Sequence, residues 1–177
     1  MKTASFLLLG LTLAAFGTGC SSPVQSVGME TDKLALSRTH PRTAAVQTNG
    51  GRPTNPLWTS QIADKDLAAA IEASIRKNNL FAGVLKLGEA DYVVNATLVN
   101  IEQPMMGFNM TVGVEIVWSL TAKGADKPIW EKSIQTRAKK GVGDAFAAVT
   151  RIRIATEAST KENIAQALAE IASLSLP

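Results

Sequence analysis

The chain has few residues of the kinds that build disulfides, zinc centres or nucleophilic sites. It contains one cysteine, Cys20, and one histidine, His40, among 177 residues. A lone cysteine has no partner for a disulfide within the chain, and a structural zinc site needs four Cys or His ligands. A Cys–His nucleophile also requires the two groups to lie side by side. We therefore expect no structural zinc, no metal site and no Cys/His nucleophile.

Charge is also too evenly spread to indicate a nucleic-acid partner. Without residues 1–19 the chain carries 17 basic and 15 acidic residues, with no stripe of either sign. The glycine pairs do not fit the strand–GxxxxGK[ST]–helix pattern of a phosphate loop. His40 precedes Pro41 in a polar segment, where we expect it to be solvated, and Asp64/Asp66 look like surface charges. No catalytic set emerges, so we expect a protein that is not an enzyme.

The one long apolar run lies at the N-terminus. Lys2 precedes the apolar residues 6–16, and the small residues Gly17, Thr18 and Gly19 follow. A basic start, an apolar stretch of about ten residues and a small-residue cut site are typical of a secretory signal peptide. A transmembrane helix needs roughly 20 apolar residues, more than this run provides. The pattern predicts a signal peptide over residues 1–19.

Cys20 directly follows Thr18-Gly19 and resembles the lipobox of bacterial lipoproteins, although Gly17 stands where that motif usually has Leu. The resemblance implies cleavage by signal peptidase II before Cys20, diacylglycerol on its sulfur and a fatty acid such as palmitate on its amine. No other cofactor is implied. Ser21 and Ser22, with no Asp after the cysteine, imply the periplasmic face of the outer membrane by the enterobacterial sorting rule. The inner membrane, or an ordinary signal peptide leaving a free thiol, is the alternative.

The composition beyond the signal peptide divides the chain into a tether and a single domain. Residues 20–45 are rich in Ser, Thr and Pro without clear periodicity, which predicts a lipidated cysteine followed by a flexible tether. Within or beside it, residues 33–37 or 43–48 are alternatives for an edge strand, and the second is favoured. Residues 46–177 are long enough for one domain with its own core.

Hydrophobic periodicity predicts the elements of that domain. A helix over 62–78 has one apolar face, and 80–84 packs as its exit. Three strands should follow, of which 110–122 has the clearest alternation of apolar and polar side chains. The last segment, 144–174, lacks Pro and Gly and should be a helix. Its predicted core face contains Phe146, Val149, Ile164, Leu168, Ile171 and Leu174.

The element order predicts an α+β fold. With strands at 91–101, 110–122 and 128–138, we expect an antiparallel meander of three to four strands. Both helices should cover one face of this sheet, giving a two-layer sandwich.

Two groups of apolar residues are candidates for binding a partner. The loop 103–109 carries Met105, Met106 and Phe108 between two strands, and adaptable Met beside an aromatic is typical of binding surfaces. The alternative is that this loop folds over one end of the core. Trp58, after the turn-rich residues 49–56, is either a ligand platform or a lid on the core.

The most unusual polar cluster lies within the last predicted helix. Arg153 and Glu157 are four residues apart and can pair along one helix face, with Arg151 nearby. These three residues form a candidate polar pocket for an anionic group or a partner carboxylate. The alternative is a helix that bends or extends past the sheet, which would leave its middle solvated.

Two segments carry a family resemblance. Residues 50–60 (GRPTNPLWTS after Gly50) and 151–157 (RIRIATE) look like those of a group of bacterial lipoproteins without an established activity. The layout is also similar to small envelope modules of the TolB N-terminal, penicillin-binding-protein-activator and LptE-like types. These resemblances imply a non-enzymatic accessory component that binds another envelope protein or a glycan. A carrier of a lipidic or anionic ligand, held near Trp118, Trp130 and Arg153, is the alternative, and an envelope hydrolase is a third.

Overall fold

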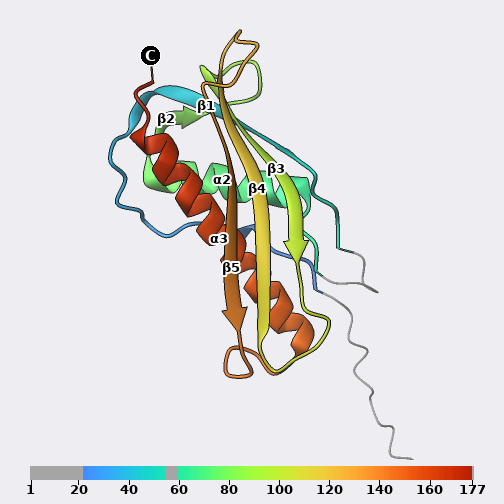
Figure 1. Cartoon of the computed structure of the whole chain (residues 1–177). Helices are drawn as coiled ribbons and strands as arrows, with labels where there is room; N and C mark the ends of the chain where they lie inside the picture. The colour runs from blue at the N-terminus through green and yellow to red at the C-terminus, as the bar shows by residue number, and fades with distance from the viewer. Residues whose placement is uncertain (1–21, 55–59, 177) are drawn as a thin grey trace, which may run out of the picture.

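The computed structural model describes residues 22–54 and 60–176, and within them the chain forms one mixed sheet covered by helices (Figure 1). Cys20 and Trp58 lie outside the described residues. The elements, in order, are α1 (Ser26–Met29), β1 (His40–Asn49), α2 (Asp64–Asn78), β2 (Phe81–Val84), β3 (Tyr92–Glu102), β4 (Met110–Ala122), β5 (Trp130–Lys140) and α3 (Ala148–Ser173).

The sheet has five strands in the order β2-β1-β3-β4-β5. The predicted meander of β3, β4 and β5 is confirmed as antiparallel, with Ala96 opposite Trp118 and Trp118 opposite Lys132. The expectation of a wholly antiparallel sheet is wrong, because β1 runs parallel to both β2 and β3. The parallel pair arises because α2 carries the chain from the end of β1 back to the start of β2, as a crossover helix does.

Two small elements differ from their predictions. The 43–48 strand is confirmed as part of β1, but it lies second in the sheet and is not an edge strand. The 80–84 segment, expected only to pack, supplies β2, which forms the edge beside β1. Its four residues are too short for an alternating pattern to be detected in the sequence.

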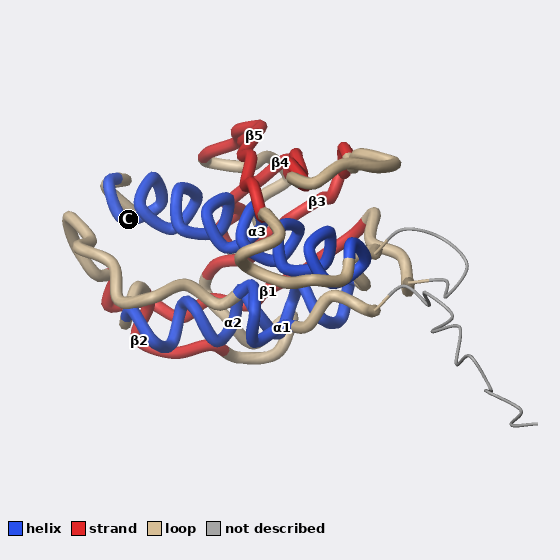
Figure 2. The backbone as a smooth tube through the Cα atoms, turned by 90° about the horizontal axis from the view of Figure 1, so that it is seen from below, coloured by secondary structure: helices blue, strands red, loops and turns tan. Residues whose placement is uncertain are grey.

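Both long helices cover one face of the sheet, as predicted. α2 packs on β1 and β2, and α3 packs on β4 and β5 (Figure 2). The alternation in β4 explains the packing, because its even-numbered side chains from Met110 to Leu120 are all buried beneath the helices. On the last helix, the predicted core residues Ile164, Leu168 and Ile171 are buried.

The start of α3 lies four residues later than predicted. Asp144 does not cap the helix. Its carboxylate accepts the Gly141 N–H at 2.8 Å, and its own N–H donates to the Gly141 carbonyl, which closes a turn before the helix. Phe146 therefore precedes α3 and is 91% exposed, so its predicted place on the core face is wrong.

The prediction of a flexible tether over 20–45 is wrong from residue 22 onward. Residues 22–39 run between α2 and α3, with Val24 and Met29 buried in the core. The segment lacks periodicity because side chains of the helices satisfy its backbone. Gln25 N–H donates to Glu157 Oε1 at 3.0 Å, Thr31 N–H to Ser74 Oγ at 3.0 Å and Leu34 N–H to Asn78 Oδ1 at 2.7 Å.

His40 also differs from its expected solvated position. It begins β1, it is buried, and its Nε2 lies 3.0 Å from the Ile171 carbonyl of α3. Its ring packs against Phe81 of β2, with ring centroids 5.3 Å apart. The residue therefore joins the sheet edge to the end of α3, which is a structural role.

Candidate functional site

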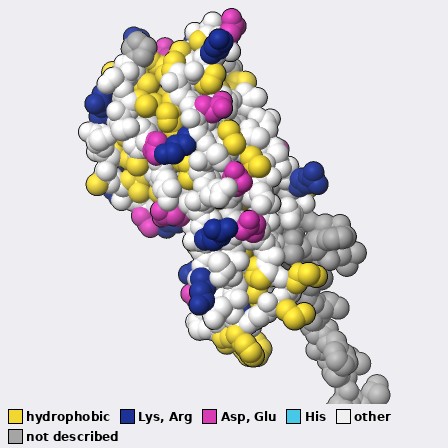
Figure 3. All heavy atoms as spheres, in the orientation of Figure 1, with side chains coloured by type: hydrophobic (Ala, Val, Ile, Leu, Met, Phe, Trp, Pro, Cys, Tyr) yellow, Lys and Arg dark blue, Asp and Glu magenta, His cyan; other side chains and the backbone are white. Residues whose placement is uncertain are grey.

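The most distinctive surface of the described structure is an apolar end formed by two loops. The β3–β4 loop (103–109) and the β5–α3 loop (141–147) both lie at the lower end of the sheet in Figure 1, and Figure 3 shows hydrophobic side chains gathered there. We call this end the apolar tip. Its exposed side chains are Met105 (95%), Met106 (85%), Phe108 (82%), Phe146 (91%) and Val142 (47%).

The exposure of Met105, Met106 and Phe108 decides between the two alternatives for their loop. A loop folded over the core would bury at least one of these side chains, and all three are more than four-fifths exposed. Contiguous exposed apolar side chains mark interaction surfaces in soluble domains. Their role as partner-binding residues stays a prediction. Phe146, which helical spacing predicts on the core face, lies exposed beside them.

Arg151 holds the two loops of the tip together. It lies in the first turn of α3 and is 6% exposed, and its guanidinium donates to the carbonyls of Ala145, at 2.9 Å, and Phe146. A third, longer bond at 3.4 Å reaches the Gly107 carbonyl in the other loop. The buried guanidinium of Arg151 therefore fixes the positions of the two loops relative to one another.

The predicted polar pocket of Arg151, Arg153 and Glu157 does not form as one site. Arg153 and Glu157 pair at 2.8 Å, as their spacing predicts. Glu157 is buried and also accepts the Gln25 N–H, so it joins α3 to the N-terminal segment. Because Arg151 reaches into the tip, only two of the three residues meet. Anion binding by any of them stays a prediction.

The first described residue is connected to the tip by a short chain of hydrogen bonds. Ser60 Oγ donates to the Ser22 carbonyl at 2.8 Å, and Gln103 Nε2 donates to the Ser60 carbonyl at 2.7 Å. Gln103 also bonds Thr156 Oγ1 of α3 at 3.2 Å. Since Gln103 is two residues before Met105, the N-terminal segment enters the domain beside the loop that carries the tip.

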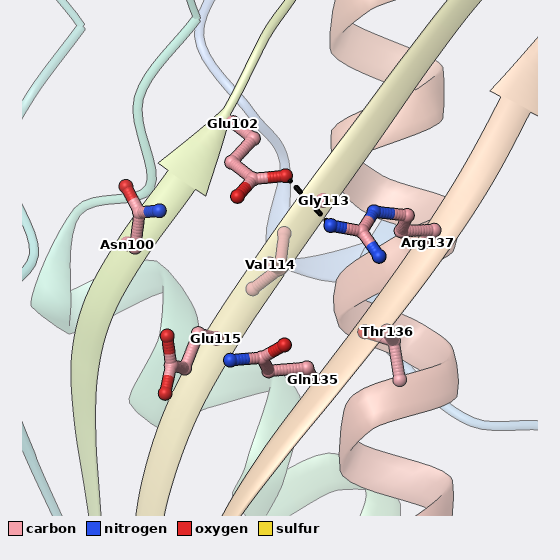
Figure 4. A pocket seen from close by; sticks show the side chains of 8 residues that line it. All are labelled: Asn100, Glu102, Gly113, Val114, Glu115, Gln135, Thr136 and Arg137. Carbon is pink, nitrogen blue, oxygen red and sulfur yellow. Dashed lines mark hydrogen bonds and ion pairs between the residues drawn. The ribbon is translucent and has the colours of Figure 1, made fainter.

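The open face of the sheet carries a shallow polar hollow close to the tip (Figure 4). Glu102 of β3 and Arg137 of β5 form an ion pair at 2.9 Å across Gly113 of β4. A Cβ on residue 113 would lie 3.0 Å from Glu102 Oε2, so a side chain there would press on the pair. The hollow has a volume of about 20 Å³, which is room for a single water.

The space beneath β4 and β5, where a ligand pocket was an alternative, is filled by side chains. Trp118 is fully buried and its Nε1 donates to Asn163 Oδ1 of α3 at 2.8 Å. Asn163 Nδ2 donates in turn to the Ile134 carbonyl at 2.8 Å. Thr136 and Ser159 bond one another beside it. We call these four side chains the buried polar network.

Three carboxylates of the described structure have lowered pKa values, and each supports a local fold. The backbone and hydroxyl of Thr43 lower the pKa of Asp91, and the Gly141 N–H, followed by Lys140, lowers the pKa of Asp144. Lys161 lowers the pKa of Asp32. Residues 22–54 and 60–176 contain no cluster of three potential metal ligands, and none of their helices is long and apolar enough to cross a bilayer.

Comparison with solved structures finds the same fold in proteins of low sequence identity to this chain. A DUF330-family protein from Xanthomonas campestris matches with a TM-score of 0.59 and 11% identity, over 85% of this chain and 91% of its own. A hypothetical protein from Chlamydia trachomatis matches with a TM-score of 0.52 and 8% identity, over 76% and 98%. The shared property is the fold.

A minor lipoprotein from Acinetobacter baumannii also matches, over 74% of this chain and 90% of its own, with 9% identity and a TM-score of 0.49. No family model matches the sequence, and no curated protein matches it. None of the three structures is described as a TolB, penicillin-binding-protein-activator or LptE-like module, so that resemblance stays a prediction.

Proposed function

We propose that this chain is a lipid-anchored protein of the bacterial cell envelope, on the periplasmic face of the outer membrane, that binds another envelope protein or assembly without catalysing a reaction. One observation carries the proposal. Ser22 is already hydrogen-bonded to Ser60 in the domain, so only Ser21 separates the lipidation residue Cys20 from folded structure. Such an arrangement holds the whole domain at the surface of the membrane that carries the acyl chains.

The chemistry of the described surface supports binding more than catalysis. Its apolar side chains protrude in the tip, where they are available to another surface. The carboxylates with lowered pKa values, such as Asp91 and Asp144, accept backbone hydrogen bonds that close loops. General acid–base catalysis needs such groups to be aimed at a substrate in a cleft, and structural bonds already engage these two.

The buried polar network counts against a carrier of a lipidic or anionic ligand. That alternative requires space near Trp118, Trp130 and Arg153. Trp118 is fully buried and bonded to Asn163, and Arg153 is paired with Glu157. A ligand there would have to displace both interactions, so we retain the binding component as the proposed function.

The anchor is tested by comparing the native protein with a Cys20→Ser variant expressed in the same bacterium. We expect the native protein to carry three acyl chains by intact mass and to float with outer membranes. The variant should be unprocessed or released into the soluble fraction. Two acyl chains suffice for stable anchoring, so the difference should be close to complete. Native protein that is soluble and unmodified would overturn the anchor.

The partner is tested by photo-crosslinking in living cells. A crosslinking amino acid at Gln135, exposed on the open sheet face, is compared with one at Lys65, exposed on α2. We expect discrete adducts with an envelope protein or glycan from one position and not from the other. If acylated protein gives only diffuse background from both positions, the proposal that it binds an envelope protein or glycan would be contradicted.

A further inference from the structure

The apolar tip and the start of the described chain lie in the same half of the molecule. In Figure 1 the described chain begins in the lower half, above the two tip loops. The hydrogen bonds from Ser22 to Ser60 and from Ser60 to Gln103 fix this arrangement. Covalent geometry allows at most about 7 Å between the Cα atoms of residues 20 and 22. Acyl chains on Cys20 would therefore enter the bilayer close to the tip.

We propose that the tip is a second membrane contact, in which Met105, Met106, Phe108 and Phe146 insert into the leaflet that holds the lipid anchor. This inference rests on the proposed anchoring through Cys20 and names the lipid surface as the occupant of the tip. Phe and Met side chains with more than four-fifths of their surface exposed protrude from the domain. Insertion into the boundary between headgroups and acyl chains needs such protrusion and no complementary shape.

The charges bordering the tip favour an anionic membrane surface. Three cations lie at the end of β5, namely Arg137, Lys139 and Lys140, against the carboxylates Glu102 and Asp144. Arg137 pairs with Glu102 and Lys140 with Asp144, while Lys139 is exposed and forms no ion pair with the described residues. An uncompensated cation beside an inserted apolar group interacts favourably with anionic lipid headgroups.

Anchoring makes the insertion an intramolecular event. A tip held near the bilayer by its own acyl chains needs little intrinsic membrane affinity, because its effective concentration at the surface is high. Arg151 adds to this by fixing the two loops to one another, so that both insert as one unit. The same contact would orient the domain on the membrane, which a single anchor point does not do.

The test uses the acylated full-length protein in vesicles of phosphatidylethanolamine with a minor fraction of phosphatidylglycerol. Because acylation occupies the one native cysteine, a Phe108→Cys variant has a single thiol for the environment-sensitive dye NBD. The matched control is Leu87→Cys, 56% exposed in the loop at the opposite end of the sheet. Phe146→Cys gives an independent second position in the other tip loop.

We expect a several-fold rise and a blue shift of NBD emission at 108 and 146, with quenching by doxyl-labelled lipid and protection from iodide. The dye at 87 should stay accessible to iodide and insensitive to doxyl lipid. Emission at 108 and 146 that matches 87 would overturn the proposal. Protection from iodide without doxyl quenching, with crosslinks between copies, would assign the tip to a protein interface and equally overturn it.

The mass of the same sample separates this inference from the proposed function. Acylated protein with both tip dyes in water contradicts the tip contact alone. Protein that lacks acyl chains contradicts the anchor, and co-sedimentation of residues 20–177 carrying Cys20→Ser, without the apolar run 6–16, with the same vesicles then reports on the tip by itself. In that assay we expect weak binding that Phe108→Asp abolishes, and equal sedimentation of the two chains would overturn the tip contact.

Discussion

The middle of α3 and the loops before its first turn have opposite chemistry. In its middle, beneath β4 and β5, the buried polar network places Asn163, Ser159 and Thr136 in the interior of the domain. At its beginning, the tip places Phe146 and Phe108 in solvent. Folded proteins normally arrange these residue types the other way. The interior exception is explained by hydrogen bonds that satisfy every member of the network. None of the residues 22–54 and 60–176 covers the tip, so its exposure has no explanation within the described part of the chain.

The network should be the more costly region to disturb. Asn163→Ala removes the acceptor of the Trp118 N–H and a donor to the Ile134 carbonyl, and each unsatisfied buried group costs about 1–3 kcal/mol. We expect a loss of about 3 kcal/mol in the free energy of unfolding, measured by urea denaturation. Gln166→Ala, on the exposed face of the same helix, is the control. Equal stabilities of the two variants would show that the network contributes nothing.

The link between the loops should have the next largest effect. Arg151→Met keeps a long apolar stem but removes the bonds to the carbonyls of residues 145, 146 and 107. Hydrogen bonds to a charged group contribute about 1.5–3 kcal/mol, so we expect a loss of about 2 kcal/mol. Amide hydrogen exchange should rise in both tip loops together. Arg137→Met, which loses only an exposed ion pair, should cost about 0.5 kcal/mol. Faster exchange in one loop alone would argue against Arg151 as the link.

Acid should weaken the loops held by carboxylates before the rest of the fold. The pKa values of Asp91 and Asp144 are lowered in the folded state, so their stabilisation is complete above the ordinary aspartate pKa of about 3.9. It is lost as the pH falls through the lowered values. We expect Asp144→Asn to reduce the acid dependence of unfolding below about pH 4, measured as a pH series of denaturation midpoints. An acid dependence that Asp144→Asn leaves unchanged would contradict this assignment.

The tip side chains themselves should matter least for stability. Met105→Ser and Phe108→Ser remove side chains that contact almost nothing, so the free energy of unfolding should change by no more than about 0.5 kcal/mol. The same variants should show the largest change in vesicle association of the non-acylated chain. A large loss of stability would mean that the loop covers the core after all. Asn163→Ala should show the opposite pattern, with a large loss of stability and no change in vesicle association.

The sequence correctly predicts those helices and strands that bury one face against a single neighbouring layer. β4 has the predicted bounds 110–122, because a strand with one buried face repeats every two residues. The segment 22–39 has no such repeat, since its backbone bonds Ser74, Asn78 and Glu157 from two different helices. Hydrophobic periodicity therefore cannot predict a segment that is held in place by hydrogen bonds to individual side chains of neighbouring helices.

The sequence predicts some residues of the candidate site and not others. Met105, Met106 and Phe108 stand out because a polar loop should not carry three large apolar residues. Helical spacing places Phe146 on the core face, because it does not reveal the hydrogen bonds of the turn between Gly141 and Asp144 that delays α3. The roles of Arg151 and Asn163 depend on partners far away in the sequence, which a single chain pattern cannot identify.

The direct entry of the chain into the domain at Ser22 also sets a height. α3 contains 26 residues, and a helix rises 1.5 Å per residue, so it extends about 39 Å from the tip toward the opposite loops. If the tip inserts as proposed, the loop 85–91 would stand at a nearly constant distance from the membrane. Under the proposed anchoring the protein would be a spacer of fixed length, and a partner bound at its far end would have to lie at that distance from the membrane.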